Sequence, residues 1–157
     1  MEKISMQILG LVEKYRSLCN SIDDPVAGIN LNEDSWSIKQ IIGHLIDSAS
    51  NNHQRIVRLL LAKTVEFPDY DKDEWLAVEN HNAVGFDVLF ELFCNFNRLI
   101  AHVISRIPET AYHHYWKTDF LDGKDRITLE ELSAHYVDHL AIHFDHLEKR
   151  ICELNNG

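Results

Sequence analysis

Apolar side chains recur at helical spacing along most of the chain, with polar side chains on the remaining positions. The repeats fall into four long segments, at about residues 4–19, 35–63, 84–107 and 128–154. Between them lie Pro25, Gly28, Pro68 and Pro108, residues that end helices or form turns. The pattern therefore predicts four amphipathic helices.

Two helix starts have recognisable capping residues. Asp34 or Ser35 is the expected N-cap of the second helix, because a short side-chain oxygen there can accept free backbone N–H groups. At the fourth helix, Thr128 is followed three positions later by Glu131, the spacing of a capping box. The third helix is expected to stop before Pro108.

The two later connections differ in character. Residues 64–82 are long for a helix hairpin, and connections of that length are often functional or form a lid. Tyr70 and Trp75 in it could cover a pocket or anchor the loop, and both readings stay open. Before the fourth helix, aromatic residues and the dipeptide Asp122-Gly123 predict a short extended hairpin.

Four amphipathic helices can bury their apolar stripes only against one another. The predicted fold is all-α: a four-helix bundle formed by a single domain over residues 1–157. The length of the connection between the second and third helices favours a crossover over simple up-and-down winding. A short hairpin before the fourth helix would complete the fold.

Composition and charge restrict the function. The chain has 45% hydrophobic and 25% charged residues and a formal net charge of -10. A negative field of that size disfavours nucleic acid and leaves a small molecule or a protein as partner. Three widely spaced cysteines indicate neither a disulfide framework nor a zinc ribbon. With no signal peptide and no apolar run judged long enough for a membrane, we expect a soluble cytoplasmic protein.

The predicted fourth helix contains four of the ten histidines. His139 and His143 have the i, i+4 spacing that lets two imidazoles chelate one metal ion, and His135 with His139 has the same spacing. His44, on the second helix, is the candidate third ligand. A lone histidine near an apolar face is more often a packed residue, so spacing alone leaves a metal site and packed histidines about equally favoured.

Three stretches of sequence resemble the DinB-like superfamily of metal-binding four-helix bundles, in particular its YfiT-like branch. They are WSIKQIIGHLIDS, PDYDKDEW and TLEELSAHYVDHLAIHFDHLEKRI, in that order, and the resemblance covers residues 36–151. It implies His44, His139 and His143 as ligands of a divalent metal, nickel or zinc. Some members of the superfamily transfer bacillithiol, mycothiol or glutathione to electrophiles, and others are described as metal-dependent hydrolases.

The resemblance therefore favours thiol transfer, with hydrolysis by metal-activated water as the alternative. A non-enzymatic metal-bearing module and a homodimer remain open. Four further residues are candidates for supporting the metal ligands or lining the pocket. Asp47 is interpreted as solvated more readily than as a partner of an imidazole, and Tyr136 as a core residue more readily than a hydrogen-bond donor to substrate. His146 and Trp75 complete the set.

Overall fold

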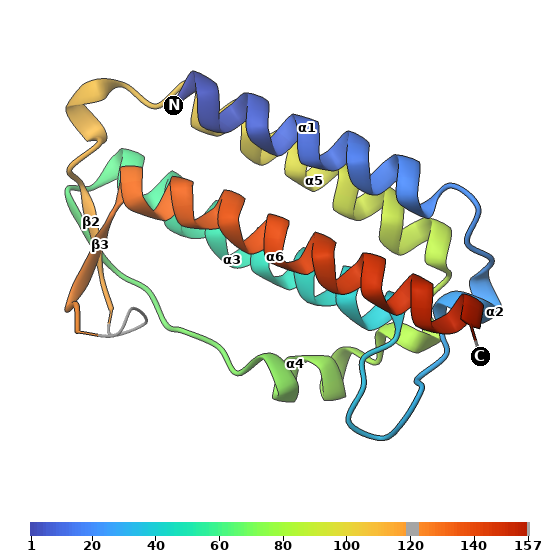
Figure 1. Ribbon diagram of the computed structural model, residues 1–157. Coiled ribbons are helices and arrows are strands. Elements are labelled where there is room, and N and C mark those ends of the chain that lie inside the picture. The colour runs from blue at the N-terminus through green and yellow to red at the C-terminus, as the bar shows by residue number, and fades with distance from the viewer. Residues whose placement is uncertain (119–122, 157) are drawn as a thin grey trace.

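Four long helices form the body of the protein in the computed structural model, which describes residues 1–118 and 123–156 (Figure 1). They are α1 (Glu2–Cys19), α3 (Ile38–Leu61), α5 (Phe86–Ser105) and α6 (Leu129–Asn156). Each lies within three residues of its predicted bounds at either end. The predicted all-α four-helix bundle is confirmed.

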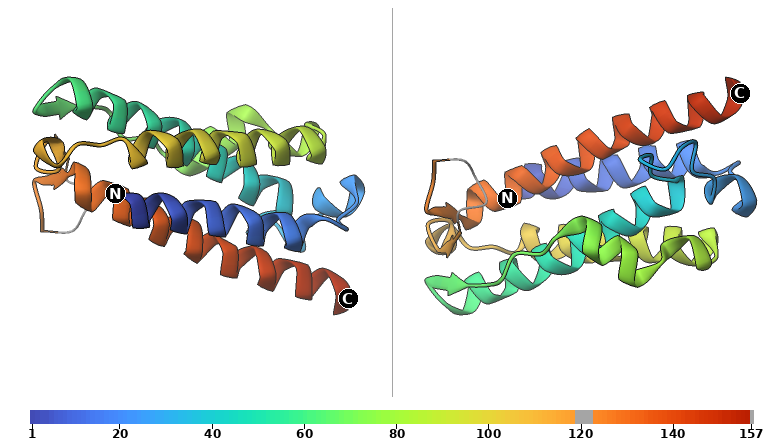
Figure 2. Two further views of the ribbon diagram at one scale, coloured as in Figure 1. Left: turned by 90° about the horizontal axis from the view of Figure 1, so that it is seen from above. Right: turned by 90° about the horizontal axis from the view of Figure 1, so that it is seen from below.

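Each long helix packs against two others, in the cyclic order α1, α5, α3, α6. The helices α3 and α5 are consecutive long helices, yet they run in the same direction (Figure 1). The chain between them must therefore return along the whole bundle, and it does so over α3, as the view from below shows (Figure 2). The predicted crossover is confirmed.

The crossover has secondary structure of its own, which the sequence pattern did not predict. It contains β1 (Thr64–Glu66), α4 (Lys72–Glu79) and the 3-10 helix η1 (His81–Ala83). At α4, the Asp71 carboxylate caps the helix by accepting from two backbone N–H groups. A single-turn helix, α2 (Asp24–Ala27), precedes α3, and a 3-10 turn, η2 (Glu109–Ala111), follows α5.

A three-stranded sheet covers one end of the bundle (Figure 1). The predicted hairpin forms it in part, because β2 (Tyr115–Lys117) pairs antiparallel with β3 (Arg126–Thr128). On the other side β2 pairs parallel with β1. Asp122 of the predicted turn lies outside the described residues, whereas Gly123 has φ +78°, a conformation that glycine adopts readily.

The two predicted N-caps had different outcomes. Thr128 and Glu131 form the capping box: the Thr128 hydroxyl accepts from the Glu131 N–H, and the Glu131 carboxylate accepts from the Thr128 N–H. At α3 the prediction of Asp34 or Ser35 was wrong. The cap is Ser37, whose hydroxyl accepts from the Gln40 N–H while the Gln40 side chain accepts from the Ser37 N–H. This reciprocal pair fixes the helix start downstream of both predicted residues.

The helix α5 also corrects the sequence analysis. By length and composition alone it could cross a membrane, contrary to the expectation that no apolar run is long enough. In the bundle it packs against both α1 and α3, and 44% of its most apolar window is buried. The core helix of a bundle is expected to pass the same test, since one face must be strongly apolar.

Candidate metal centre

Three histidine rings meet between α3 and α6. The Nε2 atoms of His44 and His139 lie 3.3 Å apart, and the ring of His143 is centred 4.7 Å from that of His44 and 4.6 Å from that of His139. One nitrogen from each ring lies within 4.8 Å of the other two. The structure thus brings together the three residues that the resemblance implied.

Helix geometry explains this convergence. His139 and His143 are four residues apart on α6, so their side chains leave the same face one turn apart. The neighbouring helix α3 runs antiparallel to α6 (Figure 1). His44 lies among the buried residues of α3. His135, the alternative partner of His139, lines the same cavity but is not in this group of three.

Burial keeps all three imidazoles neutral. It lowers the pKa of His44 and of His139 to about 4 and that of His143 to about 3. In each case the next cause is a neighbouring histidine, whose positive charge would oppose protonation. A neutral imidazole offers a lone pair, so at pH 7 the group presents three nitrogen ligands and no charge.

These residues fit a divalent metal. Two nitrogens bound to one tetrahedral ion at about 2.0–2.1 Å would lie about 3.3 Å apart, the separation seen between His44 and His139. The Nδ1 atom of His139 lies 3.4 Å from the Ser48 hydroxyl, which can hold the ring with its Nε2 free for a ligand bond. His44 Nδ1 and His143 Nδ1 are buried and have no hydrogen-bond partner in residues 1–118 and 123–156.

The three rings form part of the wall of a cavity of about 990 Å³. Trp36 also lines it, with its ring 5.2 Å from that of His44 and stacked 6.5 Å from that of His143. In the sequence, Trp36 stands out only as the first residue of the family motif WSIKQIIGHLIDS. A helical wheel could not place it here, because it lies in the loop before α3 rather than on a helix.

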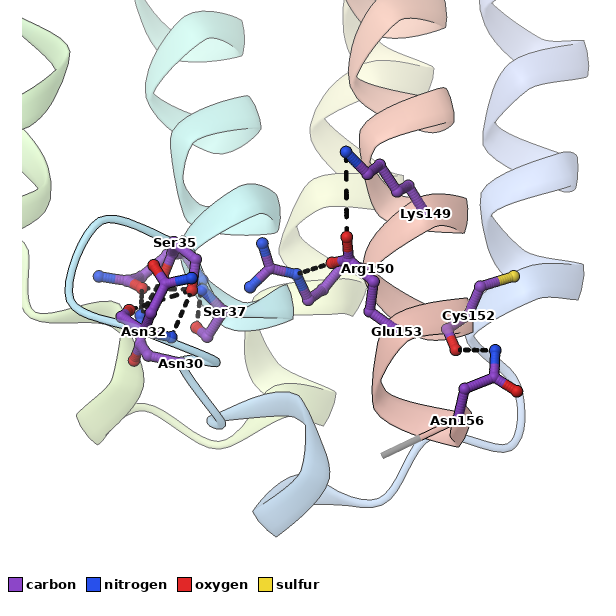
Figure 3. Close-up of polar contacts among 10 residues, drawn as sticks. Asn30, Asn32, Ser35, Ser37, Lys149, Arg150, Cys152, Glu153 and Asn156 are labelled. Carbon is purple, nitrogen blue, oxygen red and sulfur yellow. Dashed lines mark hydrogen bonds and ion pairs between the residues drawn. The ribbon is translucent and has the colours of Figure 1, made fainter.

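The outer part of this cavity carries charged side chains from the last turns of α6. Arg150 extends from the helix towards the loop that carries Asn32 and Ser35, and Glu153 contacts both Lys149 and Arg150 (Figure 3). The Nη1 atom of Arg150 is buried and without a hydrogen-bond partner among the described residues. A guanidinium in this position can bind an anionic group of a ligand by donating hydrogen bonds to it.

The four supporting candidates are in different places. His146 lines the cavity, with its ring 5.1 Å from that of His143. Tyr136 is fully buried and donates to Asn97 Oδ1 at 2.7 Å, so it belongs to the core, as its central position on the apolar stripe favoured. Trp75 packs on Tyr70 and lines a separate hollow of about 440 Å³, whereas Tyr70 lines both.

Asp47 is the clearest correction, because it was interpreted as solvated and is only 3% exposed. It lies one turn after His44 on α3 and points to a different group, formed with Glu79 and His81 of the crossover. Sequence patterns gave no signal for Glu79 or His81, because their approach to Asp47 depends on the path of the crossover.

Comparison with known proteins agrees with the fold. The family model described as DinB superfamily matches residues 11–147. This chain belongs to the DinB superfamily. The solved structure of YfiT from Bacillus subtilis superposes on this DinB superfamily chain with a TM-score of 0.84 over 98% of this chain and 86% of that one, at 18% identity. That structure is described as having an unusual four-helix bundle topology.

Two curated relatives are similar in sequence to this DinB superfamily chain, and both carry the name "putative metal-dependent hydrolase". One, from Oceanobacillus iheyensis, is 26% identical over 103 residues, which cover 66% of this chain. The other, YfiT from Bacillus subtilis, is 25% identical over 116 residues, which cover 71% of it. The chain spans 59% and 62% of the lengths of these relatives. Their names and the histidine group together support a divalent metal as the cofactor.

Proposed function

We propose that this DinB superfamily chain is a metal-dependent enzyme that transfers a low-molecular-weight thiol to an electrophile. His44, His139 and His143 would hold the divalent ion, nickel or zinc, since imidazole nitrogen suits both. The observation that supports this is the convergence of three neutral imidazoles on the wall of an open cavity. Because these ligands carry no charge, the bound ion would keep its double positive charge and favour the thiolate form of a thiol, which is the nucleophile.

The residues around the group have distinct tasks in this proposal. In the tautomer that leaves Nε2 free for a metal, Nδ1 of His139 would donate to the Ser48 hydroxyl, 3.4 Å away, and this contact would orient the ring. Trp36 covers the rings of His44 and His143 and limits the access of water to them. His146, one turn further along α6 in the same cavity, can accept the proton that the thiol loses.

The cavity is large enough for such a substrate. Its volume of about 990 Å³ lies at the upper end of about 300–1,000 Å³, the usual range for small-molecule sites. Arg150 lies seven residues, or two helical turns, after His143 on α6, so a molecule that reaches both would extend roughly 10 Å along the helix. A thiol of the bacillithiol, mycothiol or glutathione type has that reach. The carboxylates of bacillithiol or glutathione would meet Arg150, whereas mycothiol would offer neutral hydroxyl groups there.

Hydrolysis is the second candidate, and the names of the two curated relatives favour it. It would use the same three ligands, with water in place of the thiol and His146 again as the proton acceptor. The two proposals differ in what is consumed: an electrophile together with a thiol, or an ester or amide alone.

The test uses tag-free protein, stripped of metal and then reloaded with Zn²⁺ or Ni²⁺. Consumption of a fluorogenic electrophile is followed with bacillithiol, mycothiol and glutathione, and ester hydrolysis is followed without thiol. We expect turnover that needs both the metal and one of the thiols, loss of that turnover in His143→Ala, and full turnover in the surface control His102→Ala. Metal-dependent ester hydrolysis without thiol dependence would replace thiol transfer by hydrolysis. No metal-dependent turnover in either assay would overturn both.

A further inference from the structure

A second group of ligand atoms lies at the junction of α3 with the crossover. Asp47, Glu79 and His81 each offer one atom, and these atoms lie within 4.8 Å of one another. The Nε2 atom of His81 is 2.8 Å from Glu79 Oε2 and 4.0 Å from Asp47 Oδ1. Asp47 and His81 are 3% and 4% exposed, whereas the Glu79 side chain is 42% exposed and opens the group to solvent.

The backbone is shaped to bring these side chains together. Asn80, between Glu79 and His81, adopts a left-handed conformation with φ 47°, which ends α4 and reverses the chain into η1. On the opposite side, α3 has Gly43 against the His81 ring, and a Cβ there would lie 2.3 Å from the ring. The ring thus occupies space that exists only because residue 43 has no side chain.

The two carboxylates of this group repel each other whenever both are ionised. Asp47 Oδ2 is buried and has no hydrogen-bond partner among residues 1–118 and 123–156. No lysine or arginine in that part of the chain forms an ion pair with Asp47 or Glu79. Burial and the nearby Glu79 carboxylate raise the pKa of Asp47 to about 8. A cation between the two carboxylates would remove this repulsion and give the orphaned oxygen a partner.

We propose that Asp47, Glu79 and His81 form a second divalent-cation site, separate from the three-histidine group. Two carboxylates and one imidazole suit Mn²⁺, Fe²⁺ or Zn²⁺, whereas three imidazoles without a carboxylate suit Zn²⁺ or Ni²⁺. The two sites are neighbours, because Asp47 follows His44 by one turn of α3 and His81 is among the residues that lower the pKa of His44. A cation here would tie the crossover to the helix that supplies the first metal ligand.

The number of cations bound tests this proposal, independently of any activity. Metal-free, tag-free protein is dialysed to equilibrium against Zn²⁺, and in a second series against Mn²⁺, and bound metal is measured by elemental analysis. We expect two Zn²⁺ ions per wild-type chain and one Mn²⁺ ion. Asp47→Asn and Glu79→Gln should each retain one Zn²⁺ and no Mn²⁺, and His143→Ala should retain one of each.

Two features keep the result interpretable. Glu79 is partly exposed, so Glu79→Gln should fold even if a change at buried Asp47 does not, and circular dichroism checks both variants. Glu74→Gln, on the same short helix with an exposed side chain, is the matched control and should bind as wild type does. A single Zn²⁺ ion in the wild type that disappears in His143→Ala would overturn the second site. Unchanged binding in both Asp47→Asn and Glu79→Gln would do the same.

Discussion

The two histidine-containing groups differ in how the fold creates them, although α3 contributes to both. His44 meets His139 and His143 across the contact of two long helices, so the spacing of the pair on α6 and the packing of α3 against α6 align the ligands. Asp47, one turn later, meets Glu79 and His81 from the crossover, where a left-handed residue and a glycine fix the geometry. The comparison shows that ligands on regular helices can be predicted from residue spacing. Ligands brought together by a connection have no such spacing in the sequence.

The largest expected effect is on Zn²⁺ binding by the three-histidine group. In His143→Ala one of three ligands is missing, and we expect the affinity of that site for Zn²⁺ to fall by more than about 100-fold, beyond the usual effect of changing an outer partner. Competition with a chromophoric chelator measures it. His135→Ala should keep its affinity, and a larger loss in His135→Ala than in His143→Ala would reassign the ligand pair.

Gly43→Ala tests the group at the crossover. The added methyl group would overlap the His81 ring, so we expect the ring to move and Mn²⁺ binding to be lost. Overpacking of this kind typically costs about 1–3 kcal/mol of stability, which urea denaturation measures. Zn²⁺ at the three-histidine group should remain. Gly10→Ala, on α1 where a Cβ meets nothing within 4 Å, is the control that should bind both ions.

A smaller loss of metal affinity is expected when the Ser48 hydroxyl next to His139 is removed. Without the Ser48 oxygen the ring loses the contact that orients it, and removing such a partner typically costs about 10–100-fold in metal affinity. The chelator competition should therefore place Ser48→Ala between the wild type and His143→Ala. Ser50→Ala, on the same helix and outside the histidine cavity, should match the wild type.

The last comparison is the effect of pH on the stability of the metal-free protein, for which the two groups have opposite signs. The three histidines have lowered pKa values in the folded state, so the unfolded chain binds more protons below about pH 6.5. Their contribution to the free energy of unfolding therefore decreases as the pH falls from about 6.5 towards 4. The raised pKa of Asp47 has the reverse consequence, because the folded state keeps a proton that the unfolded chain releases.

Asp47→Asn separates these contributions. The variant should gain stability relative to the wild type as the pH rises from about 4 to 8, the window between the unfolded and folded pKa of Asp47. Urea denaturation of metal-free protein at several pH values measures this difference. A stability difference that is constant across the window, or that changes in the other direction, would contradict a raised pKa at Asp47.

The features that the sequence could predict are those within the long helices, and the features that it could not predict depend on the connections. Apolar periodicity located all four long helices, and the capping box of Thr128 with Glu131 fixed the start of α6. The i, i+4 spacing narrowed the histidines to two pairs, and the choice of His143 over His135 came from the family resemblance. Physical chemistry on the linear chain could not make that choice, since both pairs lie on the same side of one helix.

Non-local contacts explain what could not be predicted. The α3 cap was misplaced because Ser35 bonds within its own loop, to Asn32, while Ser37 pairs with Gln40. Asp47 was interpreted as solvated because the residues that cover it are in the crossover, more than thirty positions later. Strand β1 is only three residues long, and its partner β2 follows α5, so no local alternation could reveal it.

That strand pairing also bears on how the protein acquires its shape. Val65 aligns with Trp116 in parallel register. Closing the long stretch of chain between these two residues costs chain entropy before any contact compensates for it. The helices can form and collapse early from nearby contacts, whereas the crossover must wait until the segment after α5 is in place. We therefore expect amide protons of the crossover to exchange with deuterated solvent sooner than those in the middle of α3, through openings that leave the bundle intact.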